Sequence, residues 1–196
     1  MGKKQSYFIL KIIVKFLFKV YNILGFKICW WACVLGAISN QKYLGPILVL
    51  IYLFIHLYAI SSNARISEVY LLIFAGLFGT VTDSTLLNLN ILSYQGLYEK
   101  FNYIAPLWIT AMWVGFTATL NHAFNNIMSR YYIQFILGLI AGPVAYITGN
   151  NLGAITFSAV YDRNTIIIII AIVWGFSFPI LCWVSNILRY TKRNIR

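Results

Sequence analysis

The chain alternates between six long apolar stretches and short segments that hold most of its charged residues. A helix needs about 17 to 25 predominantly apolar residues to cross a bilayer, and these stretches have about that length. They cover residues 23–38, 44–60, 67–89, 104–124, 131–149 and 165–188. The pattern therefore predicts an all-α polytopic membrane protein with six transmembrane helices over residues 23–188, joined by loops too short to form a domain outside the membrane.

A basic segment precedes the first apolar stretch. Lys11, Lys15 and Lys19 recur every four residues, so they line one face of a helix whose other faces are largely apolar. Such a helix binds in the plane of a membrane that carries anionic lipids. Residues 1–22 are therefore expected to form a basic amphipathic arm at the membrane interface, and residues 189–196 a basic cytoplasmic tail.

The composition excludes several classes of protein. Of the 196 residues, 61% are hydrophobic and only 10% are charged, whereas a soluble domain carries about 25% charged residues. So few charges leave a large apolar surface that must face lipid. This excludes a soluble enzyme, a disordered chain and a disulfide scaffold. Cys29, Cys33 and Cys182 lie inside apolar stretches and are expected to be small packing residues. The sequence identifies no cofactor, and metal binding stays open.

The positions of the cationic residues predict the orientation of the chain. It has 15 Lys and Arg against 4 Asp and Glu. With six crossings, all cationic residues except Lys42, Lys100 and Arg163 fall on the side of both termini. Because cytoplasmic loops are enriched in Lys and Arg, both termini are expected in the cytoplasm. No basic patch remains for nucleic acid. The expected partners are the bilayer and anionic lipids of its cytoplasmic leaflet, with a homo-oligomer or a partner membrane protein left open.

Asp83 is the residue that a lipid environment tolerates least. At about 1.5 Å per residue it lies within the hydrocarbon depth of its stretch, where an ionisable side chain marks a functional site by default. Its carboxyl group is expected to be protonated at neutral pH, or hydrogen-bonded to Tyr146, Thr148 or a backbone amide freed near Pro143. The measurement that tests protonation is infrared titration of its carbonyl band.

Two helix faces in the predicted bundle carry polar residues. Glu68, Asp83 and Asn90 fall on one face of the third stretch, and this face is expected to point inward. In the fourth stretch Thr117 belongs to a polar stripe that has Trp113 at its edge. Such a stripe either lines a polar crevice or supplies hydrogen bonds between helices. The candidate binding residues are Asp83, Trp113, Thr117 and Tyr146.

A second polar group gathers where the second, third and fourth stretches approach the cytoplasmic side. We call its members the rim cluster: His56, Glu68, Asn121 and His122. Two imidazoles and a carboxylate at one depth can hold a metal ion or transfer protons. The plainer alternative is that each is an interfacial side chain, with Arg65 and Glu68 forming a surface pair. The rim cluster supplies the candidate catalytic residues.

Small residues in the fifth stretch indicate close packing. Gly138 and Gly142 lie four residues apart on one stripe, which lets a neighbouring helix approach. Pro143 and Pro179 each remove a backbone hydrogen bond from their helices and are expected to kink them. These features shape the bundle or open a pocket in it.

Several segments together resemble a known family. They are WWACVLGA at residues 30–37, PLW at 106–108, TLNHA at 119–123, GPVAY at 142–146 and NLGA at 151–154. Over roughly residues 22–188 the chain resembles the uncharacterised bacterial inner-membrane domain-of-unknown-function family 2878. The resemblance implies an inner-membrane location and a connection with lipids, but no particular reaction. The family's histidine in the second span and acids in the third fall on His56, Glu68 and Asp83, whereas the Lys-rich arm departs from the family.

Three hypotheses about function follow. In the first, the chain is a membrane-embedded enzyme, or an enzyme partner, that modifies a lipid through the rim cluster. In the second, it is a small proton- or cation-coupled transporter, or a subunit of one, that uses the intramembrane Asp83. In the third, it is a scaffold that binds another membrane protein through the face of Gly138 and Gly142.

Overall fold

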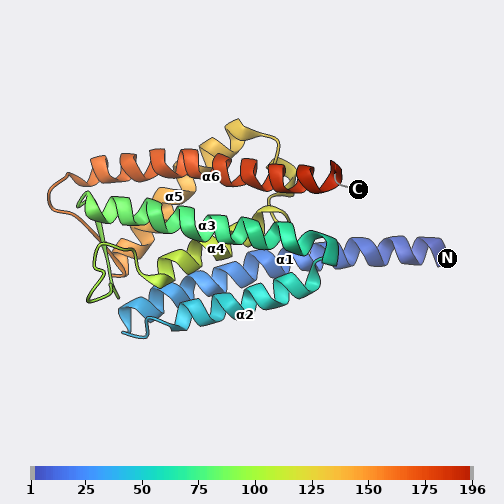
Figure 1. Ribbon diagram of the computed structural model, residues 1–196, viewed down its shortest axis with the longest axis horizontal. Coiled ribbons are helices and arrows are strands. Elements are labelled where there is room, and N and C mark those ends of the chain that lie inside the picture. The colour runs from blue at the N-terminus through green and yellow to red at the C-terminus, as the bar shows by residue number, and fades with distance from the viewer. Residues whose placement is uncertain (1–2, 195–196) are drawn as a thin grey trace.

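The computed structural model describes residues 3–194 and consists of helices apart from two short strands (Figure 1). The helices are α1 (Lys3–Ile38), α2 (Leu44–Ala59), α3 (Ser62–Asn88), α4 (Leu107–Leu120), α5 (Tyr131–Asn151) and α6 (Arg163–Asn194). A short 3-10 helix, η1, covers Asn125–Ile127, and the strands are β1 (Leu92–Tyr94) and β2 (Ile155–Phe157). The all-α class predicted from the sequence is confirmed.

Length and hydropathy together make three of the described helices candidate membrane spans, and the 36-residue α1 is not among them. Helices α3, α5 and the part of α6 up to Arg189 are long and apolar enough to cross a membrane. Helices α2 and α4 are apolar but have only 16 and 14 residues. At 1.5 Å per residue α4 is about 21 Å long, which is shorter than a hydrocarbon core of about 30 Å. Its predicted length, residues 104–124, was therefore too long at both ends.

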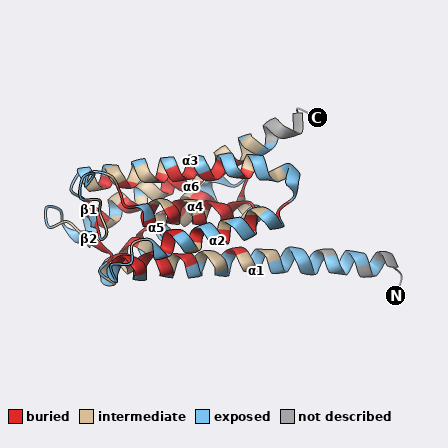
Figure 2. Cartoon of the chain, turned by 60° about the horizontal axis from the view of Figure 1, so that its bottom comes forward, coloured by how far each residue is buried: buried red, intermediate tan, exposed pale blue. Residues whose placement is uncertain are grey.

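The basic arm and the first apolar stretch form a single helix. Helix α1 continues without a break through residue 22, and its amino-terminal part projects beyond the other helices along the length of the bundle (Figures 1 and 2). Lys15 and Lys19 are exposed there, whereas the side chain of Lys11 and the basic side chains beyond Arg189 lie outside the described residues. That this arm rests on an anionic membrane surface stays a prediction.

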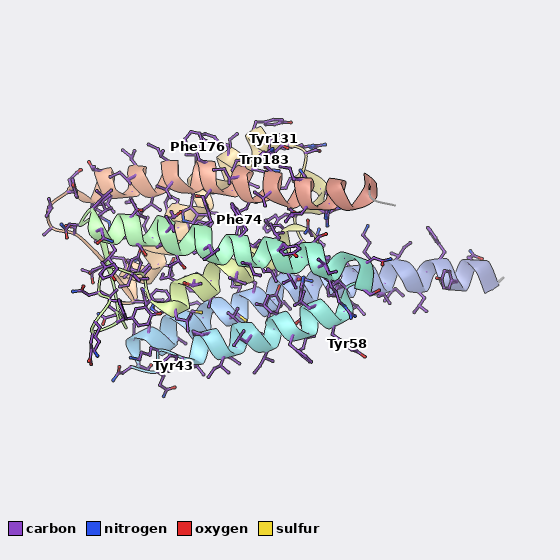
Figure 3. The ribbon with its side chains drawn as sticks, viewed as in Figure 1. Tyr43, Tyr58, Phe74, Tyr131, Phe176 and Trp183 are labelled. Carbon is purple, nitrogen blue, oxygen red and sulfur yellow. The ribbon has the colours of Figure 1, made fainter. Side chains whose placement is uncertain are left out.

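The short helix α4 lies inside the bundle. It packs against α1, α2 and α3, and nine of its 14 residues are buried, including Trp108. Helix α5 packs mainly on α6, which also contacts α3. By contrast, large apolar side chains such as Tyr58 on α2 and Phe176 on α6 point outward (Figure 3). The molecule is therefore apolar outside, and its buried polar residues lie between the helices.

Two long-range features hold the elements in register. Strands β1 and β2 pair antiparallel with Ser93 opposite Thr156, which joins the loop after α3 to the loop after α5. Helices α5 and α6 touch at Gly138 and Gly142, where an added Cβ atom would overlap the backbone and ring of Trp174. The predicted packing stripe is confirmed, and its neighbour is a helix of the same chain. Both helices continue through their internal prolines.

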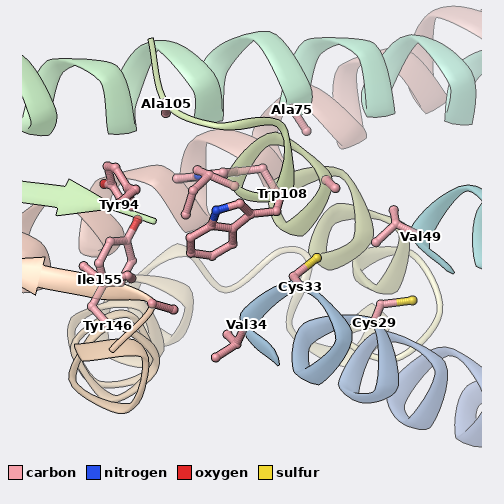
Figure 4. Packing of buried hydrophobic residues seen from close by; sticks show 14 of the residues in the cluster. Cys29, Cys33, Val34, Val49, Ala75, Tyr94, Ala105, Trp108, Tyr146 and Ile155 are labelled. Carbon is pink, nitrogen blue, oxygen red and sulfur yellow. The ribbon is translucent and has the colours of Figure 1, made fainter. Parts of the chain in front are cut away.

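The buried core continues from the strands to α1 (Figure 4). Trp108 is completely buried at its centre, and its indole N–H donates to the carbonyl oxygen of Gln95. Cys29 and Cys33 face this core from successive turns of α1, and all three cysteines are buried and unpaired. Cys33 touches Gly45 so closely that no side chain fits there. The cysteines are packing residues, as expected.

Candidate functional site

The four residues of the rim cluster meet in the structure. His56 Nε2 lies 3.2 Å from Glu68 Oε1, and His122 Nε2 lies 3.9 Å from the same oxygen. Asn121 Nδ2 donates to the other carboxylate oxygen, Glu68 Oε2, at 2.8 Å. His56, Glu68 and Asn121 are buried, while the His122 side chain is 21% exposed. Three separate segments of the chain therefore place two imidazoles and an amide around one carboxylate.

Short connections explain this convergence. Helix α2 ends at Ala59 and α3 begins at Ser62, so the two helices run back past each other. This places His56, near the end of α2, beside Glu68, near the start of α3. Helix α4 ends immediately before Asn121, which is its C-cap residue. The polar pair Asn121 and His122 thus follows a helix end inside the bundle, where it meets the α2–α3 turn.

Two further polar residues support the cluster from neighbouring helices, and sequence reasoning missed both. Asn22 Oδ1 on α1 lies 2.8 Å from His56 Nδ1 and also accepts a hydrogen bond from Tyr52. Ser185 on α6 donates to Asn121 Oδ1 at 2.7 Å. Asn22 and Ser185 are both buried. Their signal was a lone polar residue within or beside an apolar stretch, which reveals burial but does not identify the partner.

A cavity of about 460 Å³ opens beside the rim cluster. Glu68, Asn121, His122, Ser185 and Arg189 line it. Burial lowers the pKa of His122 to about 4, so this imidazole is neutral near pH 7. The alternative in which Arg65 and Glu68 form a surface pair does not hold, because the Arg65 guanidinium donates to the carbonyl oxygen of Tyr58. The cavity therefore presents a carboxylate, a neutral imidazole, an amide, a hydroxyl and a guanidinium to whatever enters it.

Asp83 is the centre of a second polar group, which we call the Asp83 group. Tyr94 and Tyr146 donate to its Oδ1 at 2.6 and 2.5 Å, and Trp113 Nε1 donates to its Oδ2 at 2.6 Å. The predicted bond to Tyr146 is confirmed, and Figure 4 shows Tyr94 beside Tyr146. Tyr94 was missed because it lies on β1, outside the predicted spans. Asp83 is completely buried, so the inward face predicted for it is confirmed.

Three other residues that the sequence analysis singled out in this region take no part in the hydrogen bonds of Asp83. Thr148 donates to the carbonyl oxygen of Val144 on its own helix rather than to Asp83. Asn90 follows the end of α3 and is exposed, with a φ of 53°, so it does not extend the inward face. Thr117 is buried, but its hydroxyl has no hydrogen-bond partner among the described residues. The structure brings together Asp83, Trp113 and Tyr146 but leaves Thr117 outside their hydrogen bonds.

An apolar cavity of about 260 Å³ lies next to the Asp83 group. Trp113 and Tyr146 line it together with Trp174, whose ring stacks on Trp113 at a centroid distance of 4.4 Å. Asp83 is not among the lining residues. The Asp83 carboxylate thus holds Trp113 and Tyr146, two aromatic residues that line the apolar cavity, without lining the cavity itself.

The comparisons with known proteins agree with the resemblance seen in the sequence. The model of the family described as "Protein of unknown function (DUF2878)" matches residues 19–180. This range contains the whole rim cluster and the whole Asp83 group, whereas Ser185 and Arg189 lie beyond it. No curated protein and no solved structure is similar enough to the chain to count as a match. Because the match covers most of its length, the chain belongs to the DUF2878 family.

Proposed function

We propose that the chain is a membrane-embedded enzyme, or the partner of one, that modifies a lipid at the rim cluster. The observation that carries this proposal is the convergence of His56, Glu68, Asn121 and His122 beside a cavity of about 460 Å³. Within residues 3–194 the loops between helices are short and form no separate domain that could bind a soluble substrate. A site at one end of an apolar bundle is where a lipid headgroup lies.

The proposed setting is the bacterial inner membrane, with six helices crossing it and both termini in the cytoplasm. The described ends of α1 and α6 lie at the same end of the bundle (Figure 1), which fits an even number of crossings. Large apolar side chains on the outer faces of the bundle fit a lipid environment. Helix α4 is shorter than the hydrocarbon core, but its neighbours and the loops at its ends shield it from lipid.

The residues of the cavity have complementary roles in this proposal. Glu68 accepts a proton from a headgroup hydroxyl or amine, because its carboxylate faces the cavity. The neutral His122 beside it is placed to accept or return a proton. Arg189, which donates to the carbonyl oxygen of Asn121, also lines the cavity and attracts an anionic headgroup.

The transport hypothesis gains less support. A carboxylate that carries a proton or cation must exchange it with a water-filled path. Asp83 is completely buried, and three side chains satisfy its two oxygens. This arrangement suits a structural role better. The scaffold hypothesis also loses its proposed surface, because α6 covers Gly138 and Gly142.

Mass spectrometry of total lipids tests the proposal. Host cells carrying no gene, the wild type, His122→Ala or Asp83→Asn would be compared, with membrane insertion checked for each protein. We expect a lipid species to appear or vanish with the wild type and to revert with His122→Ala. Asn125→Ala is a matched control, since this exposed side chain lies three residues away outside the cavity. An unchanged lipid profile with inserted wild-type protein would contradict the enzyme proposal and return attention to transport by Asp83.

A further inference from the structure

The hydrogen bonds around His56 lack one hydrogen: the ring faces an acceptor oxygen on both sides, Asn22 Oδ1 and Glu68 Oε1, but a neutral imidazole carries only one N–H. Asn22 Nδ2 donates to the carbonyl oxygen of Phe18 at 2.8 Å, which fixes the orientation of the amide and directs its Oδ1 towards His56. Tyr52 donates to the same oxygen at 2.9 Å. Because Oδ1 is an acceptor, His56 Nδ1 must carry the hydrogen. A neutral His56 then presents a lone pair at Nε2.

That lone pair points at another acceptor. Glu68 Oε1 lies 3.2 Å from His56 Nε2, and a carboxylate oxygen has no hydrogen to donate. His122 Nε2 lies 3.9 Å from the same oxygen and has no hydrogen-bond partner among the described residues. The lone pairs of His56 Nε2 and Glu68 Oε1 therefore face each other with no hydrogen between them, and His122 Nε2 adds a third lone pair when the hydrogen of that imidazole is on Nδ1. A positive species at this point, either a proton or a metal cation, removes the conflict.

Distances and supporting contacts favour a metal cation. The three ligand atoms all lie within 4.8 Å of one another. Bond lengths of about 2.0 to 2.2 Å place neighbouring tetrahedral zinc ligands about 3.3 to 3.5 Å apart. The 3.2 Å between His56 Nε2 and Glu68 Oε1 matches this spacing, and His122 Nε2 lies somewhat farther from the same oxygen, at 3.9 Å. Asn22 orients His56 and Asn121 holds Glu68 Oε2, as second-shell groups do at metal sites.

We propose that His56 Nε2, Glu68 Oε1 and His122 Nε2 bind one divalent first-row transition-metal ion of the zinc type. Two histidines and a carboxylate leave a coordination position free, as catalytic sites do. The cavity borders Glu68 and His122, so the free position faces the proposed substrate. The ion would polarise a headgroup oxygen or activate water there. In the metal-bound site His122 would be a ligand instead of a proton acceptor, and Glu68 Oε2 would accept the proton. This catalytic meaning rests on the proposed function, whereas metal binding itself is tested separately.

The test measures the metal content of the full-length protein purified in detergent. After dialysis against metal-free buffer, inductively coupled plasma mass spectrometry would quantify zinc, iron, manganese and cobalt per chain. We expect about one bound ion per wild-type chain and at least about tenfold less in Glu68→Gln and His122→Ala. Asn125→Ala should keep the ion.

The controls separate loss of metal from loss of fold. Size-exclusion elution and helical circular dichroism must match the wild type before a variant is counted. Wild-type protein that holds no more metal than His122→Ala, even after incubation with zinc, overturns the proposal and leaves a proton between His56 and Glu68. Metal binding without a lipid change would retain this site but contradict the lipid proposal. A lipid change without metal binding would retain the lipid proposal but overturn the metal site.

Discussion

Asp83 is held in the interior by three side chains that donate hydrogen bonds to it. Tyr94, Trp113 and Tyr146 come from three different elements, so this carboxylate joins β1, α4 and α5 to α3. In Asp83→Asn an amide group replaces one acceptor oxygen, and a buried donor loses its partner. Each such loss costs about 1–3 kcal/mol. We expect the free energy of unfolding to fall by this amount, measured by denaturation in mixed micelles with tryptophan fluorescence as the signal.

Glu99→Gln is the matched control for this prediction. Glu99 is exposed, and a surface substitution of this kind changes stability by less than about 0.5 kcal/mol. If Asp83→Asn unfolds at the same denaturant concentration as Glu99→Gln, the structural role of Asp83 is wrong. The transport hypothesis would then become the better explanation of a buried acid.

At the scale of elements, the contact between α5 and α6 depends on two positions without a side chain. A Cβ atom at Gly138 would overlap the carbonyl group of Trp174, which cannot move without moving α6. Overpacking of this kind costs about 1–3 kcal/mol. We therefore expect Gly138→Ala to lower the free energy of unfolding by that amount in the same micelle assay, although alanine favours a helix more than glycine does.

Gly76→Ala tests whether the effect comes from the contact. Gly76 is also helical, but its added Cβ would lie 3.1 Å from Val114 Cγ2, a side-chain atom that can shift. We expect a smaller loss, or a gain from the higher helix propensity of alanine. Equal losses at the two positions would mean that the approach of α5 to α6 is not the cause.

The sequence predicted the elements whose positions follow from runs of apolar residues, and it missed contacts between segments that are distant in the chain. The apolar stretches located six helices because burial requires continuous apolar runs, and Gly138 and Gly142 identified a close contact. The pairing of β1 with β2 was missed, since each strand has only three residues and they lie far apart in the chain. Asn22 was interpreted as the end of the basic arm. A single amide in the sequence does not reveal that its partner is His56 on another helix.

The candidate site shows the same division. Helix depth alone placed His56, Glu68, Asn121 and His122 at one level, since depth follows from counting residues along each stretch. Their convergence depended on which helices are neighbours, and this order is not encoded in any local pattern. Ser185 was missed for that reason, because it reaches Asn121 from α6. Conversely, Thr117 lies on the polar stripe of α4 that has Trp113 at its edge, but its hydroxyl has no hydrogen-bond partner among the described residues.

At the scale of the whole molecule, the charge distribution predicts an orientation in the membrane, and the shape of the bundle is compatible with it. The described ends of α1 and α6 lie together (Figure 1), and that side carries all but three of the 15 Lys and Arg residues in the predicted topology. Cationic loops resist transfer across the membrane, so this end is expected to stay in the cytoplasm. The rim cluster lies near the start of α3 and would then face the cytoplasmic leaflet, whereas β1 and β2 would lie at the opposite surface.

Cysteine labelling of single substitutions tests this orientation without a cysteine-free background. Cys29, Cys33 and Cys182 are at most 3% exposed, so a membrane-impermeant maleimide should leave them unmodified. Arg65 lies in the first turn of α3, and Lys100 lies in the loop that follows the other end of this helix. Both side chains are exposed. With both termini inside, Lys100→Cys should react when the protein is produced in a bacterial host whose outer membrane is permeabilised, whereas Arg65→Cys should react only after lysis. The reverse pattern would place the termini and the rim cluster outside, and equal labelling of both in unlysed cells would mean that α3 does not cross.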